Sequence, residues 1–521
     1  MLRDRRWEWA PLVVAFAYLI VLVTRLRDLM AHNALNADSV SAPVIGELLH
    51  SAPAGREVLL GNFPWYQQLW FEQATHWAPA HRQLWELFPF GMAIVAIALA
   101  TWAAARVAGR WGAALTAVAL FCASNPLITN FFQGTTHSVT SAQVALLAAT
   151  AVWLATQPEL GRGALIGVIV VAGGLTAIGV ASDELLFAAG IVPFAFAALA
   201  LWRMVSLRAG VAAAGVLAVG VVGGLILKAI MHGAGYRIAP LGLHFADQAK
   251  LFTNGRLGIE SIAYLGNGDF WGQKLGARGV FALVCCALVL TAAWAAIRLV
   301  RGWARERVVE DPARVVFITF WSVCAIGTAA VFVLSTAPVD ILSSRYLVPA
   351  WFALCSLLPL LALRAPAARV AIAAGVAIVG LASVIALARG DATDNLANWP
   401  DGNLQGQLRT ALQREHLKVG YAGYWDAAPI TWGTHQDLEV YPVYACNNAQ
   451  LCRFYFHNIS SWYTPRPNTR TYLIVDPAQP LVSGPDPALG KPAKTLAVGR
   501  LQVYVYDYDI ASKFGPGPAT G

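Results

Sequence analysis

The sequence predicts an α-helical polytopic membrane protein with about eleven transmembrane helices and a C-terminal α/β domain outside the membrane. Three observations lead to this fold class. Hydrophobic residues make up 57% of the 521 residues and charged residues only 13%, about half the charged fraction of an ordinary soluble domain. Apolar stretches of roughly twenty residues recur, each long enough to cross a bilayer core. After about residue 390 this pattern gives way to short segments of alternating residues, which is typical of strands.

Eleven apolar segments are predicted to span the membrane. They cover residues 11–29, 88–106, 112–130, 140–156, 164–182, 185–202, 209–231, 279–299, 315–336, 345–363 and 369–388. The first follows a basic start and has no small-residue cleavage site behind it, so we expect a retained span and not a cleaved signal peptide. The glycine-rich stretch at 171–179 lies inside a span, where small residues serve close helix packing.

Arginine residues predict the orientation of these spans. The short connections 107–111, 157–163, 203–208, 300–314 and 364–368 lie on one side together with Arg3, Arg5 and Arg6, and most of them carry arginine. The positive-inside rule makes that side cytoplasmic. Because the number of spans is odd, the C-terminal residues then lie outside. With an alanine- and arginine-rich composition, we expect a bacterial inner membrane protein whose N-terminus is cytoplasmic and whose C-terminal domain is periplasmic.

Three polar segments are then extracytoplasmic: residues 30–87, residues 232–278 and residues 390–521. We expect residues 1–389 to form the transmembrane domain and residues 390–521 a soluble α/β domain. In the first segment, apolar residues after Asp38 fall on one helical face, and an aromatic-rich stretch follows at 64–77. This pattern predicts two short helices that lie on the outer membrane surface.

The C-terminal segment carries strand and helix signals. "LKVGYAGYW", "RTYLIVDP" and "LQVYVYDYDI" predict strands, and residues 403–417 have helical periodicity. Cys446 and Cys452 lie in this polar region, so a disulfide is expected if it faces an oxidising compartment, with two free thiols as the alternative.

Ionisable and polar residues gather at the outer ends of the predicted spans. They are Asp38, His137, Asp183, Glu184, Lys228, Arg345 and Tyr346. Because a charge in a membrane segment costs a few kcal/mol, such residues are usually paired or functional. All of them are predicted to lie on the outer side of the membrane, as a shared cavity would require.

The acidic residues among them each have a structural and a functional interpretation. Asp38 is either the N-cap of the following helix or a general base that accepts a proton from an acceptor hydroxyl. Asp183 and Glu184, in "VASDELLF", either mark a tight turn between spans or position a substrate, hold a metal or assist the base.

The cationic and neutral residues also each have a structural and a functional interpretation. Arg345, in "SSRYLVPAW", either anchors the span at the interface or binds a phosphate, for which its planar fork of donors is suited. Lys228 more often extends to the interface, and His137 more often bonds within its loop than contacts a substrate.

Several function classes are excluded. The net charge of +8 is scattered between spans, which argues against nucleic acid. No phosphate-binding loop or dinucleotide motif is present, so nucleotides are not expected to be direct substrates. His50, His76 and His81 lack metal-ligand spacing, so no zinc site is assigned.

In its architecture and local motifs the chain resembles the GT-C superfamily of integral membrane glycosyltransferases, which includes aminoarabinose, mannosyl and arabinofuranosyl transferases. The shared features are an acid in a long first outer loop (Asp38), acids at a second outer junction (Asp183 and Glu184), and "RY" at the outer end of a late span (Arg345 and Tyr346). The segment "VGYAGYWDAAPITW" at 419–432 also looks like a stretch of the soluble C-terminal domains of some bacterial members. The chain has no DxD in the first loop and no WWD motif, which argues against peptide N-glycosylation.

The resemblance implies transfer of a sugar from a polyprenyl-phosphate donor to a glycan, lipid or protein acceptor outside the cytoplasm, with inversion. Asp38 would be the catalytic base, Asp183 and Glu184 would line the same cavity, and Arg345 would bind the donor phosphate. That last role would be helped by Tyr346 and Lys228. No cofactor is expected to be required, and no motif supports a divalent metal.

The C-terminal domain would cap the cavity and help to select the acceptor. Six of its aromatic residues would stack on sugars or, as we favour, form ordinary core: Tyr421, Tyr424, Trp425, Trp432, Trp462 and Tyr463. A secondary transporter or a lipid-carrier flippase of the cell envelope is the alternative function. A transporter often shows internal repeats, and no convincing repeat is present.

Overall fold

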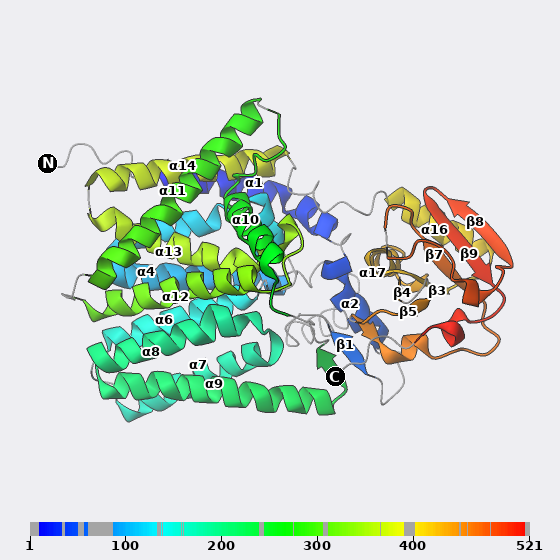
Figure 1. Ribbon diagram of the computed structural model, residues 1–521, viewed down its shortest axis with the longest axis horizontal. Helices are drawn as coiled ribbons and strands as arrows, with labels where there is room; N and C mark the ends of the chain where they lie inside the picture. Colours follow the sequence, from blue (N-terminus) through cyan, green and yellow to red (C-terminus); the bar gives the residue numbers. More distant parts are fainter. Residues whose placement is uncertain are drawn as a thin grey trace. The chain divides into compact units, whose positions relative to one another are not determined.

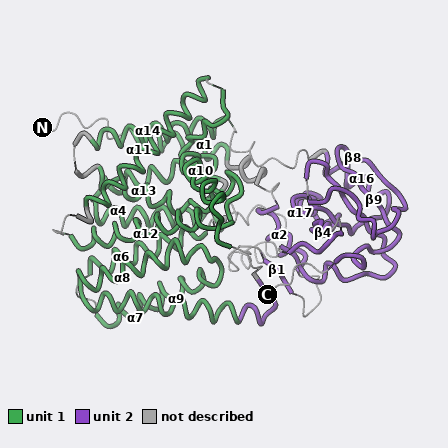
Figure 2. Tube along the Cα trace, viewed as in Figure 1, with its two compact units in different colours: residues 1–26, 88–229, 242–392 green, residues 27–87, 230–241, 393–521 purple. Residues whose placement is uncertain are grey.

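A computed structural model of the protein is shown in Figure 1. It describes residues 10–33, 37–49, 57–60, 87–132, 137, 139–157, 159, 161–238, 244–274, 276–305, 311–364, 366–389, 402–446, 450–455, 457–479 and 481–515. The chain forms two compact units (Figure 2). Unit 1 comprises Met1–Leu26, Phe88–Ala229 and Gly242–Ala392, and unit 2 comprises Arg27–Leu87, Ile230–Leu241 and Thr393–Gly521.

Unit 1 is built from helices. In chain order these are α1 (Ala10–Asn33), α4 (Leu87–Phe121), α5 (Asn125–Leu127), η3 (Ile128–Phe132), α6 (Thr140–Thr156), α7 (Arg162–Ser182), η4 (Phe187–Ile191), α8 (Val192–Met204), α9 (Leu207–Gly233), α10 (Gln248–Leu265), α11 (Ala277–Arg305), α12 (Pro312–Leu334), η5 (Ile341–Leu347), α13 (Val348–Arg364) and α14 (Pro366–Arg389). Helix α12 is central, because it packs against α6, α8 and α13 (Figure 1).

Within the described residues, eight helices are long and apolar enough to cross a membrane. They are Phe88–Phe121, Arg162–Ser182, Phe187–Met204, Leu207–Gly233, Ala277–Gly302, Pro312–Leu334, Ile341–Leu361 and Ala368–Arg389. Ala10–Arg25 and Thr140–Thr156, which match two further predicted spans, are shorter apolar helices. Large apolar side chains such as Val170, Val171 and Leu225 are exposed, which is the expected state of a surface that faces lipid. The predicted fold class of a multi-pass helical membrane protein is confirmed.

Two predicted spans differ in detail from the helices. Residues 88–106 and 112–130 are predicted as separate helices, and this is confirmed, because α4 consists of two helices joined at a kink where Gly109 has a φ of 69°; the difference lies in the second of them. Residues 122–124 then interrupt the second segment, and α5 begins after Ser124, whose hydroxyl accepts a hydrogen bond from Leu127 N–H. The interruption follows from Pro126 in the first turn of α5, which lacks the N–H needed to continue the ladder of α4.

Glycines bring α7 and α9 close together, as predicted for the stretch 171–179. A Cβ atom added at Gly173 would lie 2.8 Å from Val219, and one added at Gly220 would lie 2.7 Å from Thr176. Because real Cβ atoms do not approach so closely, these positions need glycine.

Unit 2 contains two sheets. The larger has the strand order β5-β4-β3-β7-β9-β8, in which β3 pairs parallel with β4 and β7 and the other pairs are antiparallel. Its strands are β3 (Val419–Gly423), β4 (Glu439–Ala445), β5 (Leu451–Arg453), β7 (Thr471–Val475), β8 (Lys494–Val498) and β9 (Leu501–Tyr506). The smaller sheet joins three distant segments in the order β2-β1-β6. Its strands are β1 (Val58–Leu60), β2 (Tyr236–Ile238) and β6 (Asn458–Ile459).

Helices α2 (Ala37–Leu49), α16 (Gly402–Arg414) and α17 (Tyr424–Gly433) pack with these sheets. Short turns of helix complete the unit: η6 (Ser460–Tyr463), η7 (Pro487–Leu489) and η8 (Ile510–Lys513). The predicted strands near 419, 471 and 501 and the helix near 403 are all present. Residues Cys446 and Cys452 form a disulfide with their Cα atoms 5.8 Å apart.

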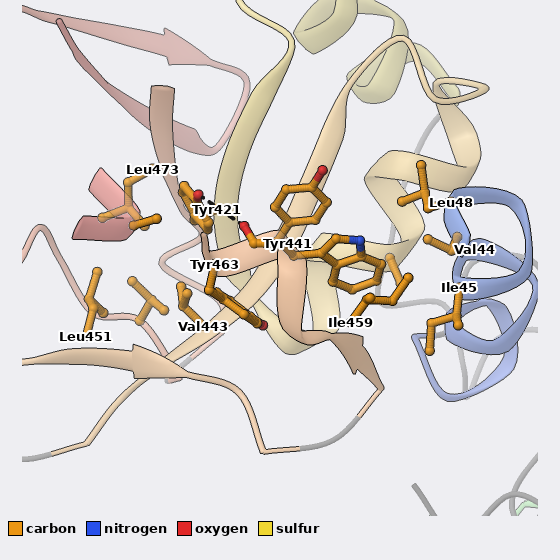
Figure 3. Close-up of a cluster of buried hydrophobic side chains, with 14 of the residues drawn as sticks. Val44, Ile45, Leu48, Tyr421, Tyr441, Val443, Leu451, Ile459, Tyr463 and Leu473 are labelled. Carbon is orange, nitrogen blue, oxygen red and sulfur yellow. Dashed lines mark hydrogen bonds between the residues drawn. The ribbon is translucent and has the colours of Figure 1, made fainter. Parts of the chain in front are cut away.

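The apolar face of α2 does not lie on a membrane surface as expected. Val44, Ile45 and Leu48 are buried in one cluster with Tyr441 and Ile459 of unit 2 (Figure 3), and α2 packs against α17 and β6. Helical periodicity establishes that a face is apolar but not what covers it, and here protein covers it. The second expected surface helix, near 64–77, lies outside the described residues.

Candidate functional site

Asp38 lies in the first turn of α2 and is half-buried. The Tyr424 hydroxyl donates a hydrogen bond of 2.6 Å to Asp38 Oδ1. Tyr424 is the first residue of α17, which begins directly after β3 ends at Gly423. A parallel central strand followed at once by a helix thus fixes the place of the hydroxyl that holds Asp38.

A buried histidine lies behind this pair. His457 Nδ1 is 2.7 Å from the Tyr424 hydroxyl oxygen, and the two rings stack with centroids 5.9 Å apart. Burial lowers the pKa of His457 to about 3, so its imidazole is neutral at pH 7. The Tyr424 ring also stacks on the Phe454 ring, with the two ring centroids 4.6 Å apart.

A small pocket adjoins this network. Its lining residues are Ser41, Val44, Tyr424, Ala428, Val440, Pro442, His457 and Trp462. Most of the lining is apolar, and Ser41, Tyr424, His457 and Trp462 are its residues with polar side-chain groups. Five of the six aromatic residues considered for sugar stacking are buried, and only Trp425 is exposed. This favours the core interpretation of those five.

Unit 1 holds a second polar cluster, centred on Asp183. This residue follows the last residue of α7 and is buried. Its Oδ2 lies 2.7 Å from His137 Nδ1 and accepts a hydrogen bond from the Thr140 hydroxyl, and its Oδ1 accepts one of 2.9 Å from Leu185 N–H. Burial tends to raise the pKa of the Asp183 carboxyl, but these partners outweigh it and lower that pKa below its ordinary value. Asp183 is therefore a carboxylate whose oxygens are occupied within the protein.

His137 is the residue that this carboxylate orients. It has a φ of 70°, a conformation unusual for a residue with a side chain, and its side chain is buried. With Nδ1 directed at Asp183, the other ring nitrogen is buried, and among the described residues it has no hydrogen-bond partner. Buried polar atoms are nearly always satisfied, so Nε2 is a candidate contact for a substrate.

Arg345 and Tyr346 adjoin this cluster. The Tyr346 ring lies 5.3 Å from the His137 ring, and Arg345 Cζ lies 5.2 Å from the Tyr346 ring centroid. Both residues belong to the short 3₁₀ helix η5, which Asp340 caps with its side chain. The sequence placed them at the start of a longer helix, and the helix proper begins at Val348.

Glu184 and Lys228 form a separate pair. Their side chains approach to 3.7 Å and are 65% and 48% exposed. An exposed pair of this kind contributes little stability. Neighbouring acids in the sequence thus differ in environment, since Asp183 is buried and Glu184 is exposed.

The residues predicted from the sequence therefore fall into two groups. Asp38 belongs to unit 2, and the other six lie in unit 1, where His137, Asp183, Arg345 and Tyr346 are close together. Sequence reasoning missed the bond between Tyr424 and Asp38 and gave no weight to His457. The local sequence around His457 carries no motif that would have found it. Among the described residues, no group of three His, Cys, Asp or Glu side chains could hold a metal ion.

The chain combines a bundle of membrane-spanning helices with a mixed α/β unit, and this fold is similar to that of two solved structures. No protein-family model and no curated protein matches the sequence. Two solved structures match nearly the whole chain, both of ArnT from Cupriavidus metallidurans. The apo structure has a TM-score of 0.57 and the structure bound to undecaprenyl phosphate one of 0.54. Each is 13% identical and covers 96% of this chain and 99% of its own. The predicted resemblance is confirmed at the level of the fold.

Proposed function

We propose that the protein is an inverting glycosyltransferase that moves a sugar from a polyprenyl-phosphate donor to an acceptor outside the cytoplasm. The observation that carries this proposal is the fold match over 96% of the chain to ArnT, one of whose structures is bound to undecaprenyl phosphate.

In the proposed reaction, Asp38 is the general base. The acceptor hydroxyl attacks the anomeric carbon of the donor sugar while its proton passes to the Asp38 carboxylate. The bond between the anomeric carbon and the phosphate oxygen breaks, and the polyprenyl phosphate leaves with the electron pair. A single displacement of this kind inverts the anomeric carbon.

Arg345 is proposed to bind the donor phosphate. Its guanidinium presents a fork of N–H donors that suits phosphate oxygens, and negative charge develops on that phosphate as the bond breaks. Tyr346, whose ring lies beside the guanidinium, helps to hold it. Lys228 is proposed to assist as a second cation, although its nearest charged partner is Glu184. His137, oriented by Asp183, is proposed to contact the substrate through Nε2. Because both oxygens of Asp183 have partners in the protein, we infer that its role is to orient His137.

The proposed topology follows the arginine distribution. The transmembrane helices lie within residues 1–389, with the N-terminus in the cytoplasm of a bacterium. Residues 390–521 lie outside, together with the outer segments Arg27–Leu87 and Ile230–Leu241 that belong to the same compact unit. The disulfide between Cys446 and Cys452 supports an oxidising compartment for this second part.

The test of the proposed function is donor consumption by the purified protein in vesicles of bacterial envelope lipid. Undecaprenyl-phosphate-linked mannose, glucose, arabinofuranose and aminoarabinose are offered in turn. We expect at least one to be consumed, with release of an equal amount of undecaprenyl phosphate. Donor consumption by Asp38→Asn is then compared with that by Asp247→Asn. Asp247→Asn is the matched control, because Asp247 is an exposed N-cap of α10 and asparagine caps equally well. Failure of all four donors together with no binding of undecaprenyl phosphate would contradict the proposal.

A further inference from the structure

Three segments of unit 2 that are distant in sequence meet at Asp38. The carboxylate comes from α2, the Tyr424 hydroxyl from the start of α17, and the His457 imidazole from the residue before β6. The hydrogen bonds between them are 2.6 Å and 2.7 Å long. Tyr424 and His457 are each 2% exposed, so this network is built into the interior of the unit.

The protons in this chain can be placed by counting donors. A carboxylate only accepts, so the single hydroxyl proton of Tyr424 points at Asp38 Oδ1. The hydroxyl oxygen then accepts from His457 Nδ1. Because burial keeps His457 neutral, its one ring proton lies on Nδ1, and Nε2 carries the lone pair.

We propose that Tyr424 and His457 are positioning residues for Asp38, with His457 held as its Nδ1–H tautomer so that both hydrogen bonds run toward the carboxylate. This inference rests on the proposed function, in which Asp38 is the base. It also gives Tyr424 and His457 of the C-terminal part a role in the proposed reaction, because they set the orientation of the base.

Packing makes this arrangement rigid. The Tyr424 ring is stacked on Phe454, with the rings 4.6 Å apart and 11° from parallel, and His457 stacks on it as well. The helix that carries Asp38 is fixed by its buried side chains Val44 and Ile45. A base held by a neighbour that is itself locked keeps the geometry that proton transfer requires.

The first experiment compares Tyr424→Phe with Tyr444→Phe. Tyr444 lies in the same aromatic cluster, against Phe454 and Tyr455, so its variant removes a hydroxyl without touching the bond to Asp38. In the donor-consumption assay we expect Tyr424→Phe to lower kcat about ten- to a hundredfold. Its KM, its binding of undecaprenyl phosphate and its thermal stability should stay within twofold or a few degrees of the Tyr444→Phe values. A kcat equal to that of Tyr444→Phe would overturn the proposal.

A pair of variants at His457 separates positioning from packing. His457→Asn can keep an N–H donor near the Nδ1 position, whereas His457→Leu fills similar space without a donor. We expect the asparagine variant to retain several times more kcat than the leucine variant. If both variants lose kcat equally and have equal thermal stability, His457 acts through packing alone and the proposal is overturned for this residue.

The tautomer itself can be measured without any activity. Nitrogen-15 NMR of histidine-labelled protein, assigned with His457→Asn, should show His457 as the Nδ1–H form in the wild type. The opposite tautomer would overturn the inference even if the enzyme is active. If no donor is consumed but the Nδ1–H form is found, the network stands and the proposed function fails, so the two failures are distinguishable.

Discussion

Replacing Ile45 by alanine tests whether α2 belongs to the core of unit 2. The Ile45 side chain is completely buried and lies in the cluster that also holds Tyr441 and Ile459 (Figure 3). The change removes three carbon atoms, a transfer loss of about 2.4 kcal/mol at roughly 0.8 kcal/mol for each methylene. The cavity left behind brings the expected total to about 2–5 kcal/mol.

Hydrogen–deuterium exchange of the central strand β3 measures this effect. Its amides exchange when the unit opens, so a loss of about 2 kcal/mol speeds their exchange roughly 30-fold and larger losses speed it further. Ile166→Ala is the matched control, because the same atoms are removed from an exposed side chain of α7. If exchange of β3 in Ile45→Ala equals that in the control, α2 does not stabilise the unit and its apolar face must be covered by something else, such as lipid.

Three further predictions concern pH, the disulfide and the donor site. On acidification from pH 7 to pH 5, unfolded His457 gains a proton at its ordinary pKa, while the folded residue, with a pKa of about 3, does not. The stability that neutral His457 contributes to the folded state is therefore complete above the unfolded pKa and falls by about 2 kcal/mol between pH 7 and pH 5. The temperature of thermal unfolding should accordingly depend less on pH in His457→Asn than in the wild type. Replacing Cys446 and Cys452 by serine should lower the free energy of unfolding by about 2 kcal/mol, since the bridged residues are only six apart; the wild type with reductant should unfold at the temperature of the variant. Arg345→Gln should weaken undecaprenyl phosphate binding at least about tenfold in a titration, because a charged hydrogen-bond donor is lost. Lys228→Gln should weaken it less, because that side chain is half exposed; an equal loss in both variants would contradict the assignment of the phosphate to Arg345.

The transmembrane part could be predicted from the sequence because runs of twenty apolar residues are rare outside helices that cross a bilayer. Even the finer breaks have local causes, such as Gly109 within α4 and Pro126 at the start of α5. The strands of the C-terminal part were equally visible, since alternation and turn residues are local signals.

The partners of the candidate residues could not be predicted. Tyr424 and Asp38 are 386 residues apart in sequence, and no pattern in either segment specifies the other. The adjacent residues Asp183 and Glu184 look alike in the sequence, yet tertiary packing buries one and exposes the other. The periodicity of α2 showed an apolar face, but its cover is a core built mainly from residues beyond 419.

The most direct test of the central claim is the initial rate of sugar transfer by Asp38→Asn beside its affinity for undecaprenyl phosphate. Asparagine keeps the size of the side chain and can still accept a hydrogen bond from Tyr424, but it cannot take up the acceptor proton. We predict a fall of about a hundredfold or more in the rate, the usual contribution of a general base, with undecaprenyl phosphate affinity within twofold of the wild type. Transfer at the wild-type rate by Asp38→Asn would contradict the assignment of Asp38 as the base.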